Sequence, residues 1–159
     1  MNRSSRKSDL TLSTLARLAN TWVPRAAGWD HLLGEEDGWG PAHELGHALI
    51  EPKARRSKEG YGRCAAGFCI HDGEECDVYE VAAMLISSKL VTAAGRPELA
   101  GEEVDATDDY DRISTPENFR RAKALLKRKK LWPVPRTTTT LEQALRVRLP
   151  RNPLNPLNE

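Results

Sequence analysis

Apolar residues recur at intervals of three and four in several segments of the chain, which is the spacing of one face of an α-helix. The pattern predicts helices over residues 9–22, 41–50, 74–91, 116–130 and 141–149, the first capped by Ser8 and the third ended near Gly95. Signals for strands are few and lie in Tyr61–Ile70 and Thr137–Thr140. For Thr137–Thr140 the alternative to a strand is a linker. We therefore predict a mainly α fold of the α+β type, with a compact helical core and at most a small β-sheet or hairpin.

Length, charge and cysteine content narrow the class of protein. The 159 residues suit one domain, placed at 9–149 between a disordered N-terminus at 1–8 and a Pro- and Asn-rich tail at 150–159. Lys and Arg number 24 against 23 Asp and Glu, so the net charge predicts no polyanionic partner. No apolar run approaches the roughly 18 residues of a membrane span. Three cysteines fit a reducing compartment, so we expect a cytoplasmic protein with no membrane partner.

One pentapeptide carries the clearest chemical signal in the chain. Residues His43-Glu44-Leu45-Gly46-His47 read H-E-x-x-H within the helix predicted over residues 41–50. Side chains four residues apart share one helical face, so both imidazoles can bind a single Zn²⁺. Glu44, next to the first histidine, can accept a proton from a metal-bound water. The alternative explanation is an amphipathic helix with two half-buried histidines and a surface glutamate.

A catalytic zinc site usually has three protein ligands, so a third is expected from another segment. On the helix predicted over residues 74–91, Asp77 falls within the apolar arc, where a carboxylate needs a cation, a metal or good donors. Glu80 lies at one edge of the arc and Glu75 near the other. We predict Asp77 as the ligand and keep Glu75 and Glu80 as alternatives. The explanation of Asp77 that involves no metal is its place near the helix N-terminus, where an acidic side chain is favoured.

The two predicted helices together resemble a known family. His43-Glu-Leu-Gly-His47-Ala-Leu, followed later by Asp77-Val-Tyr-Glu-Val-Ala-Ala-Met-Leu-Ile, is similar to the ImmA/IrrE-type minimal zinc metallopeptidases, which are gluzincin-like H-E-x-x-H enzymes. Those proteins pair H-E-L-G-H with a second helix reading roughly E-A-N-x-F-A-A-x-L-L. Asp77 matches the leading acid of that helix, which is the family's third zinc ligand.

The resemblance implies a zincin-like core and a zinc-dependent endopeptidase of the cytoplasm. Its substrate would be a protein or peptide, such as a transcriptional repressor. His43, His47 and Asp77 would hold Zn²⁺, and Glu44 would be the general base. A second electrophile often comes from His or Tyr in such enzymes, and the candidates here are His71, Tyr79 and Tyr61.

A second group of residues offers an alternative metal site. Cys64, Cys69, His71 and Cys76 lie within 13 residues and have the soft or borderline ligand atoms of a closed structural zinc site. Their spacing differs from the common C-x2-C knuckle, and reduced, partly buried cysteines are the commoner outcome.

A basic segment, Arg120–Lys130, raises the alternative of a non-catalytic interaction protein built on a peptidase-like fold. Seven of its residues are Lys or Arg, which is typical of contact with nucleic acid or with an acidic protein surface. A solvated amphipathic helix, balanced by the acidic stretch Glu102–Asp111, explains the same pattern, and the near-zero net charge favours it.

Overall fold

The computed structural model describes residues 8–23, 34, 38–50, 74–101 and 112–148, and within these ranges the chain is mainly helical, as predicted. The described residues form five α-helices and one 3-10 helix, and no strand is found among them. Their bounds are α1 Leu12–Trp22, α2 Trp39–Ile50, α3 Glu74–Ala93, η3 Pro97–Gly101, α6 Pro116–Arg128 and α7 Thr138–Arg148.

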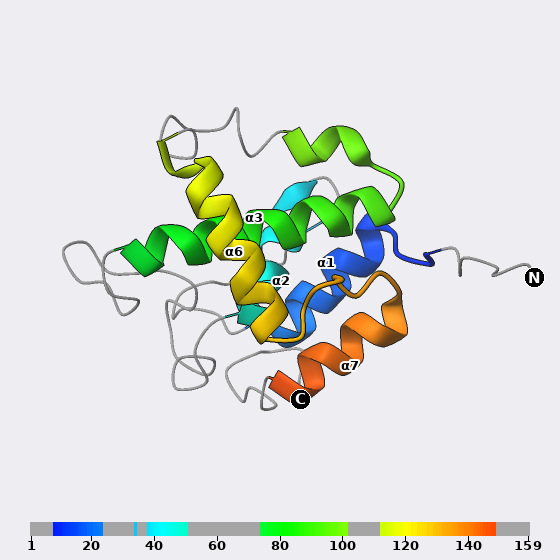
Figure 1. The fold of residues 1–159 in the computed structure, drawn as a ribbon. Coiled ribbons are helices and arrows are strands. Elements are labelled where there is room, and N and C mark those ends of the chain that lie inside the picture. Colours follow the sequence, from blue (N-terminus) through cyan, green and yellow to red (C-terminus); the bar gives the residue numbers. More distant parts are fainter. Residues whose placement is uncertain (1–7, 24–33, 35–37, 51–73, 102–111, 149–159) are drawn as a thin grey trace, which may run out of the picture.

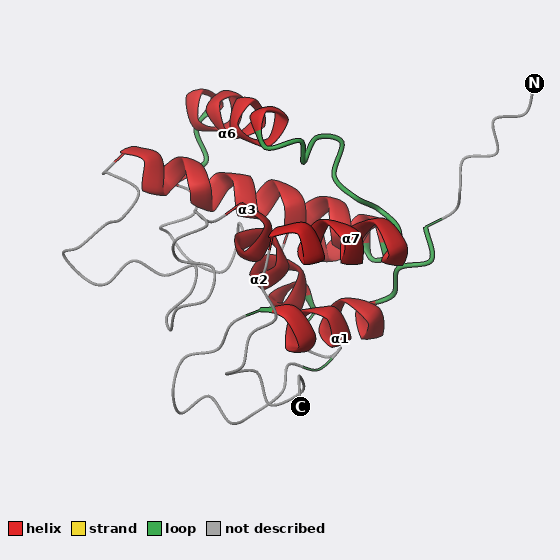
Figure 2. Ribbon diagram, turned by 90° about the horizontal axis from the view of Figure 1, so that it is seen from below, coloured by secondary structure: helices red, strands yellow, loops and turns green. Residues whose placement is uncertain are grey.

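The long helix α3 organises the fold (Figure 1). It packs most extensively against α2, and it also contacts α6 and η3. Figure 2 shows α6 on one side of α3 and α1 with α2 on the other. Helix α7 closes the bundle against α1 and α2. The core between these helices is made of fully buried leucine and isoleucine side chains, among them Leu18, Leu45, Leu49, Ile86, Leu90, Leu141 and Leu145.

Local hydrogen bonds explain where several helices begin and end. The hydroxyls of Thr11 and Thr115 accept hydrogen bonds from the backbone N–H groups three residues later, which caps α1 and α6. Helix α3 ends in a Schellman motif at Gly95, whose φ of 80° is in the left-handed region. There the Arg96 N–H donates to the Val91 carbonyl at 2.9 Å, and the Gly95 N–H donates to the Thr92 carbonyl at 3.0 Å.

The N-terminal segment is fastened to the start of α7, far away in the sequence. The Ser8 hydroxyl donates a hydrogen bond to the Arg136 carbonyl, and the Thr138 N–H donates to the Asp9 carboxylate at 2.8 Å. Further along, the Arg17 guanidinium lies 3.9 Å from the Glu142 carboxylate. Ser8 therefore belongs to the folded structure and does not cap α1, because the helix begins three residues later than predicted behind Thr11.

The threonine run is the other correction to the predicted elements. Three of its residues, Thr138–Thr140, open α7 instead of forming a strand or linker. The Thr137 hydroxyl accepts a hydrogen bond from the Thr140 N–H at 3.1 Å, which satisfies a donor in the first turn of the helix. The other expected strands, at Tyr61–Ile70, lie outside the described residues, as do the segments 1–7 and 150–159.

Candidate metal centre

The two histidines of the H-E-x-x-H motif lie on one face of α2 and point to the same place. His43 and His47 are 7% and 4% exposed, so both imidazoles are withdrawn from bulk water. Their Nε2 atoms are 3.0 Å apart, and the rings meet edge to face with centroids 4.6 Å apart. The predicted convergence of the two imidazoles is confirmed.

Helix α3 adds a carboxylate to this pair. One Glu80 oxygen, Oε1, lies 3.2 Å from Nε2 of His47, and the other, Oε2, lies 3.7 Å from Nε2 of His43. One ligand atom from each of the three residues lies within 4.8 Å of the other two. His43, His47 and Glu80 therefore form a group that could hold a metal ion.

The distances within this group suit a small divalent ion. A tetrahedral zinc with bonds of roughly 2.0–2.1 Å holds its ligand atoms about 3.3 Å apart. The two Nε2 atoms are 3.0 Å apart, Oε1 of Glu80 is 3.2 Å from His47 and Oε2 is 3.7 Å from His43, and these separations lie on both sides of that value. Two imidazoles and one carboxylate are also a donor set that catalytic zinc sites use, with the fourth position left for water. Without an ion, the same contacts are a histidine hydrogen bond and a histidine–carboxylate pair.

A glycine in the motif lets α2 and α3 approach closely enough to form the group. A Cβ built on Gly46 would lie 2.8 Å from the Ala83 carbonyl oxygen and 3.2 Å from its Cα. Both of those atoms are backbone, so they cannot move aside as a flexible side chain can. Gly46 directly precedes His47, and Ala83 lies one turn after Glu80. This close contact of the two helices is thus within one turn of His47 and Glu80.

Apolar, buried residues adjoin the three ligands along α2 and α3. The Trp39 ring meets the His43 ring edge to face, with centroids 5.3 Å apart. The α2 residues Ala42 and Leu45 and the α3 residue Val81 have no exposed surface. Such neighbours lower the local dielectric and strengthen the attraction between an ion and its ligands.

Asp77 does not join the histidines, which corrects the predicted ligand set. Its side chain is 38% exposed, and one carboxylate oxygen lies 3.9 Å from the Arg112 guanidinium. Asp77 precedes Glu80 by three residues, which rotates it by about 60° around the helix axis. That rotation turns Asp77 toward solvent and Glu80 toward α2. The alternative ligand Glu80 is the one that the structure favours, while the side chain of Glu75 lies outside the described part.

Neither Glu44 nor Tyr79, the one candidate electrophile among the described residues, belongs to the group formed by His43, His47 and Glu80. Glu44 follows His43 on α2 and is partly exposed. Tyr79 faces α6, where the Lys129 ammonium lies 5.7 Å from the centre of its ring. The geometry therefore does not bring Tyr79 into the group with Glu80. His71 and Tyr61 lie outside the described residues.

The alternative cysteine site falls almost wholly outside the described residues. Cys64, Cys69 and His71 are not described, and Cys76 is a partly buried residue in the first turn of α3. The basic segment Arg120–Lys130 forms most of α6 and its end, with Ala122, Leu125 and Leu126 buried and most of its basic residues exposed. It is an amphipathic helix, in agreement with the solvated-helix explanation.

Comparisons with known proteins give no relative for this chain. No protein-family model matches the sequence, no curated protein is significantly similar to it, and no solved structure is significantly similar to its fold. The resemblance to ImmA/IrrE-type peptidases, which rests on the motif residues alone, stays a prediction. Among the described helices, none has the length and apolar character needed to cross a membrane.

Proposed function

We propose that this chain is a zinc-dependent endopeptidase of the cytoplasm that acts on a regulatory protein. The observation that carries the proposal is the convergence of His43, His47 and Glu80 from two separate helices onto one point. The H-E-x-x-H spacing supports it further, because the motif supplies a general base beside the first ligand. The substrate class, a regulatory protein, comes from the resemblance to the ImmA/IrrE-type peptidases.

Each residue has a distinct role in the proposed reaction. His43, His47 and Glu80 hold the ion, which, when bound, supplies Lewis-acid activation of a water and of the scissile carbonyl. Glu44 accepts the proton of the attacking water and returns it to the leaving amine. Trp39 restricts the movement of the His43 ring, and the apolar side chains around the histidines exclude bulk water.

Metal analysis of purified protein tests the ligand set. The wild type is expected to hold about one zinc per chain, in line with a single three-ligand site. His43→Ala, His47→Ala and Glu80→Gln should each lose the metal, and Asp77→Asn should retain it as the matched control from the same helix. Loss of metal in Asp77→Asn together with retention in Glu80→Gln would restore the original ligand prediction and contradict this one.

Glu44→Gln separates a peptidase from a non-catalytic metal protein. This variant should keep its zinc and lose hydrolysis of a mixed peptide library, with cleavage followed by mass spectrometry. The carboxamide has nearly the shape of the carboxylate but cannot accept the proton. Equal cleavage by wild type and Glu44→Gln would remove Glu44 from the mechanism. If the zinc-loaded wild type cleaved no peptide, the result would favour a structural role, in which the ion links α2 to α3 without catalysis.

A further inference from the structure

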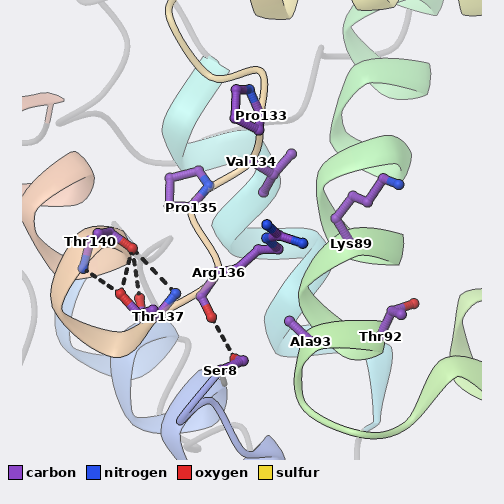
Figure 3. Close-up of a pocket in the computed structure, with 10 residues that line it drawn as sticks. All are labelled: Ser8, Lys89, Thr92, Ala93, Pro133, Val134, Pro135, Arg136, Thr137 and Thr140. Carbon is purple, nitrogen blue, oxygen red and sulfur yellow. Dashed lines mark hydrogen bonds between the residues drawn. The ribbon is translucent and has the colours of Figure 1, made fainter. Parts of the chain in front are cut away.

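A cavity of about 720 Å³ lies at the far end of α3 from the proposed metal centre (Figure 3). Its walls come from three parts of the chain: the N-terminal Ser8, the end of α3 with Lys89 and Ala93, and the segment 133–140. Lys89 follows Glu80 by nine residues, which is about 13 Å along the helix axis and roughly half a turn around it. The cavity is therefore separate from the metal centre and independent of the proposed function.

Two exposed cations, Lys89 and Arg136, belong to the cavity wall. Lys89 comes from α3 and Arg136 from the segment before α7, and no described residue that lines the cavity is Asp or Glu. Within the described part of the chain, neither side chain is recorded in an ion pair. In Figure 3 the Arg136 side chain extends from its segment toward α3, into the space between them. The Lys89 ammonium lies 5.6 Å from the centre of the Trp132 ring.

The hydroxyl groups of the wall already donate hydrogen bonds within the protein. The Ser8 hydroxyl donates to the Arg136 carbonyl, and the Thr92 hydroxyl donates to the Ser88 carbonyl at 2.7 Å. The Thr140 hydroxyl donates to the Thr137 carbonyl at 3.2 Å, and the Thr137 hydroxyl lies 2.7 Å from the Thr140 hydroxyl oxygen, to which it can donate, as the dashed lines in Figure 3 show. The donors left for a ligand are the guanidinium and the ammonium, and both of these select an anion.

The rest of the wall is apolar. Val134, Pro135 and Ala93 supply aliphatic surface from the two sides of the cavity, and Val134 is buried. A volume of this size is within the range of pockets that hold small organic molecules, about 300–1,000 Å³. An inorganic ion would satisfy the cations but would leave the aliphatic surface in contact with water.

We propose that this cavity binds a small organic anion with an apolar body, of the fatty or aromatic carboxylate class. The Arg136 guanidinium forms two hydrogen bonds to the carboxylate, and Lys89 adds a second positive charge. The apolar body lies against Val134, Pro135 and Ala93. Binding fastens the segment 133–137 to the end of α3.

Titration of the full chain with octanoate, followed by the backbone amide signals in NMR, tests this proposal. Octanoate should shift the signals of the cavity wall around residues 89–93 and 134–140. Acetate, which has the charge alone, and octanol, which has the apolar chain alone, should each bind at least about tenfold more weakly. An absence of shifts with octanoate, or equal binding of octanol, would overturn the proposal.

Variants locate the binding. Arg136→Gln and Lys89→Gln should each weaken octanoate binding by about tenfold, because each loses a charge-assisted hydrogen bond. Ala93→Leu should block the cavity. Lys127→Gln, an exposed position on α6 outside the cavity wall, is the matched control and should bind as the wild type does. Equal weakening in Lys127→Gln would indicate general attraction to a basic surface and contradict the assigned site. The melting temperature of each variant reports whether it is folded.

Discussion

Gly46 faces the backbone of Ala83 so closely that a methyl group on its α-carbon would lie 2.8 Å from the Ala83 carbonyl oxygen. One turn away along α3, Glu80 reaches the two histidines of α2. The geometry of the candidate metal centre therefore depends on the spacing between α2 and α3.

Gly46→Ala should damage stability and metal binding together. The added methyl must push α2 and α3 apart, since the atoms that it meets are backbone. We expect a loss of about 1–3 kcal/mol in the free energy of unfolding, the usual range for overpacking a close contact. Zinc affinity should fall with it, because the histidines and Glu80 separate. Denaturant unfolding and zinc titration measure the two effects.

Ser88→Ala is the control for this substitution, since Ser88 is a partly exposed residue of α3. It should change the free energy of unfolding by no more than about 0.5 kcal/mol. A Gly46→Ala variant with wild-type stability and wild-type zinc affinity would show that the helices can move apart without affecting the centre.

Glu80 and Asp77 should respond differently to a change of one methylene. Glu80→Asp withdraws the carboxylate from the histidines and should weaken zinc binding at least about tenfold, since even outer-shell changes at metal sites have effects of that size. Asp77→Glu should leave the affinity unchanged, because the Asp77 side chain is directed toward Arg112 and solvent. Competition with a chromogenic chelator gives both affinities, and equal losses in the two variants would contradict the assignment of Glu80.

Zinc should stabilise the folded chain, because the three ligands come together only when α2 packs on α3. At a zinc concentration one hundred times the Kd, the expected gain is about 2.7 kcal/mol. For a chain of this size that corresponds to a rise in Tm of about 5–10 °C. The rise should disappear on addition of a chelator and in Glu80→Gln. A similar rise in wild type and Glu80→Gln would indicate that zinc binds elsewhere, with the cysteines as the first alternative.

Asp9 should contribute to stability in a pH-dependent way. The Thr138 N–H donates a hydrogen bond to its carboxylate, which lowers the pKa of Asp9 below the ordinary value of 3.8. A lowered pKa means that the stabilisation is present above pH 3.8 and is lost as the pH falls through the pKa of the folded state. An NMR titration of the Asp9 carboxyl measures this directly.

Asp9→Asn provides the matching equilibrium test, because it removes the charge and retains an oxygen acceptor. The difference in unfolding free energy between wild type and variant should shrink as the pH is lowered below 3.8. A pKa of 3.8 or higher for Asp9 in the folded chain would contradict the hydrogen bond to Thr138.

The helices could be predicted from the sequence because their signals are local. Termination at Gly95 depends on residues within a few positions, and periodic leucines define the buried faces. The strand or linker predicted at Thr137–Thr140 is wrong for a local reason. β-Branched residues favour strands, but here the hydrogen bond from the Thr140 N–H to the Thr137 hydroxyl stabilises the first turn of a helix.

The ligand set could be predicted only in part, for a physical reason. His43 and His47 are held together by one helix, so their spacing in the sequence is sufficient. The choice between Asp77 and Glu80 depends on which side of α3 meets α2, and that is set by the contact between Gly46 and Ala83. The sequence did offer one signal for this packing, because Gly46 and the small residue Ala83, one turn after Glu80, allow two helices to approach closely. A pattern of apolar positions on one helix, however, does not identify the helix that packs against it.

The attachment of Ser8 and Asp9 to Arg136 and to the first residue of α7 has a consequence for the order of events during synthesis. Helix α1 is made before the other described helices, yet the partners of the residues that precede it, Arg136 and Thr138, are among the last described residues to be made. Ser8 and Asp9 therefore cannot form these hydrogen bonds until residues 136–138 have been made. A nascent chain arrested before residue 136 would hold α1 without that attachment.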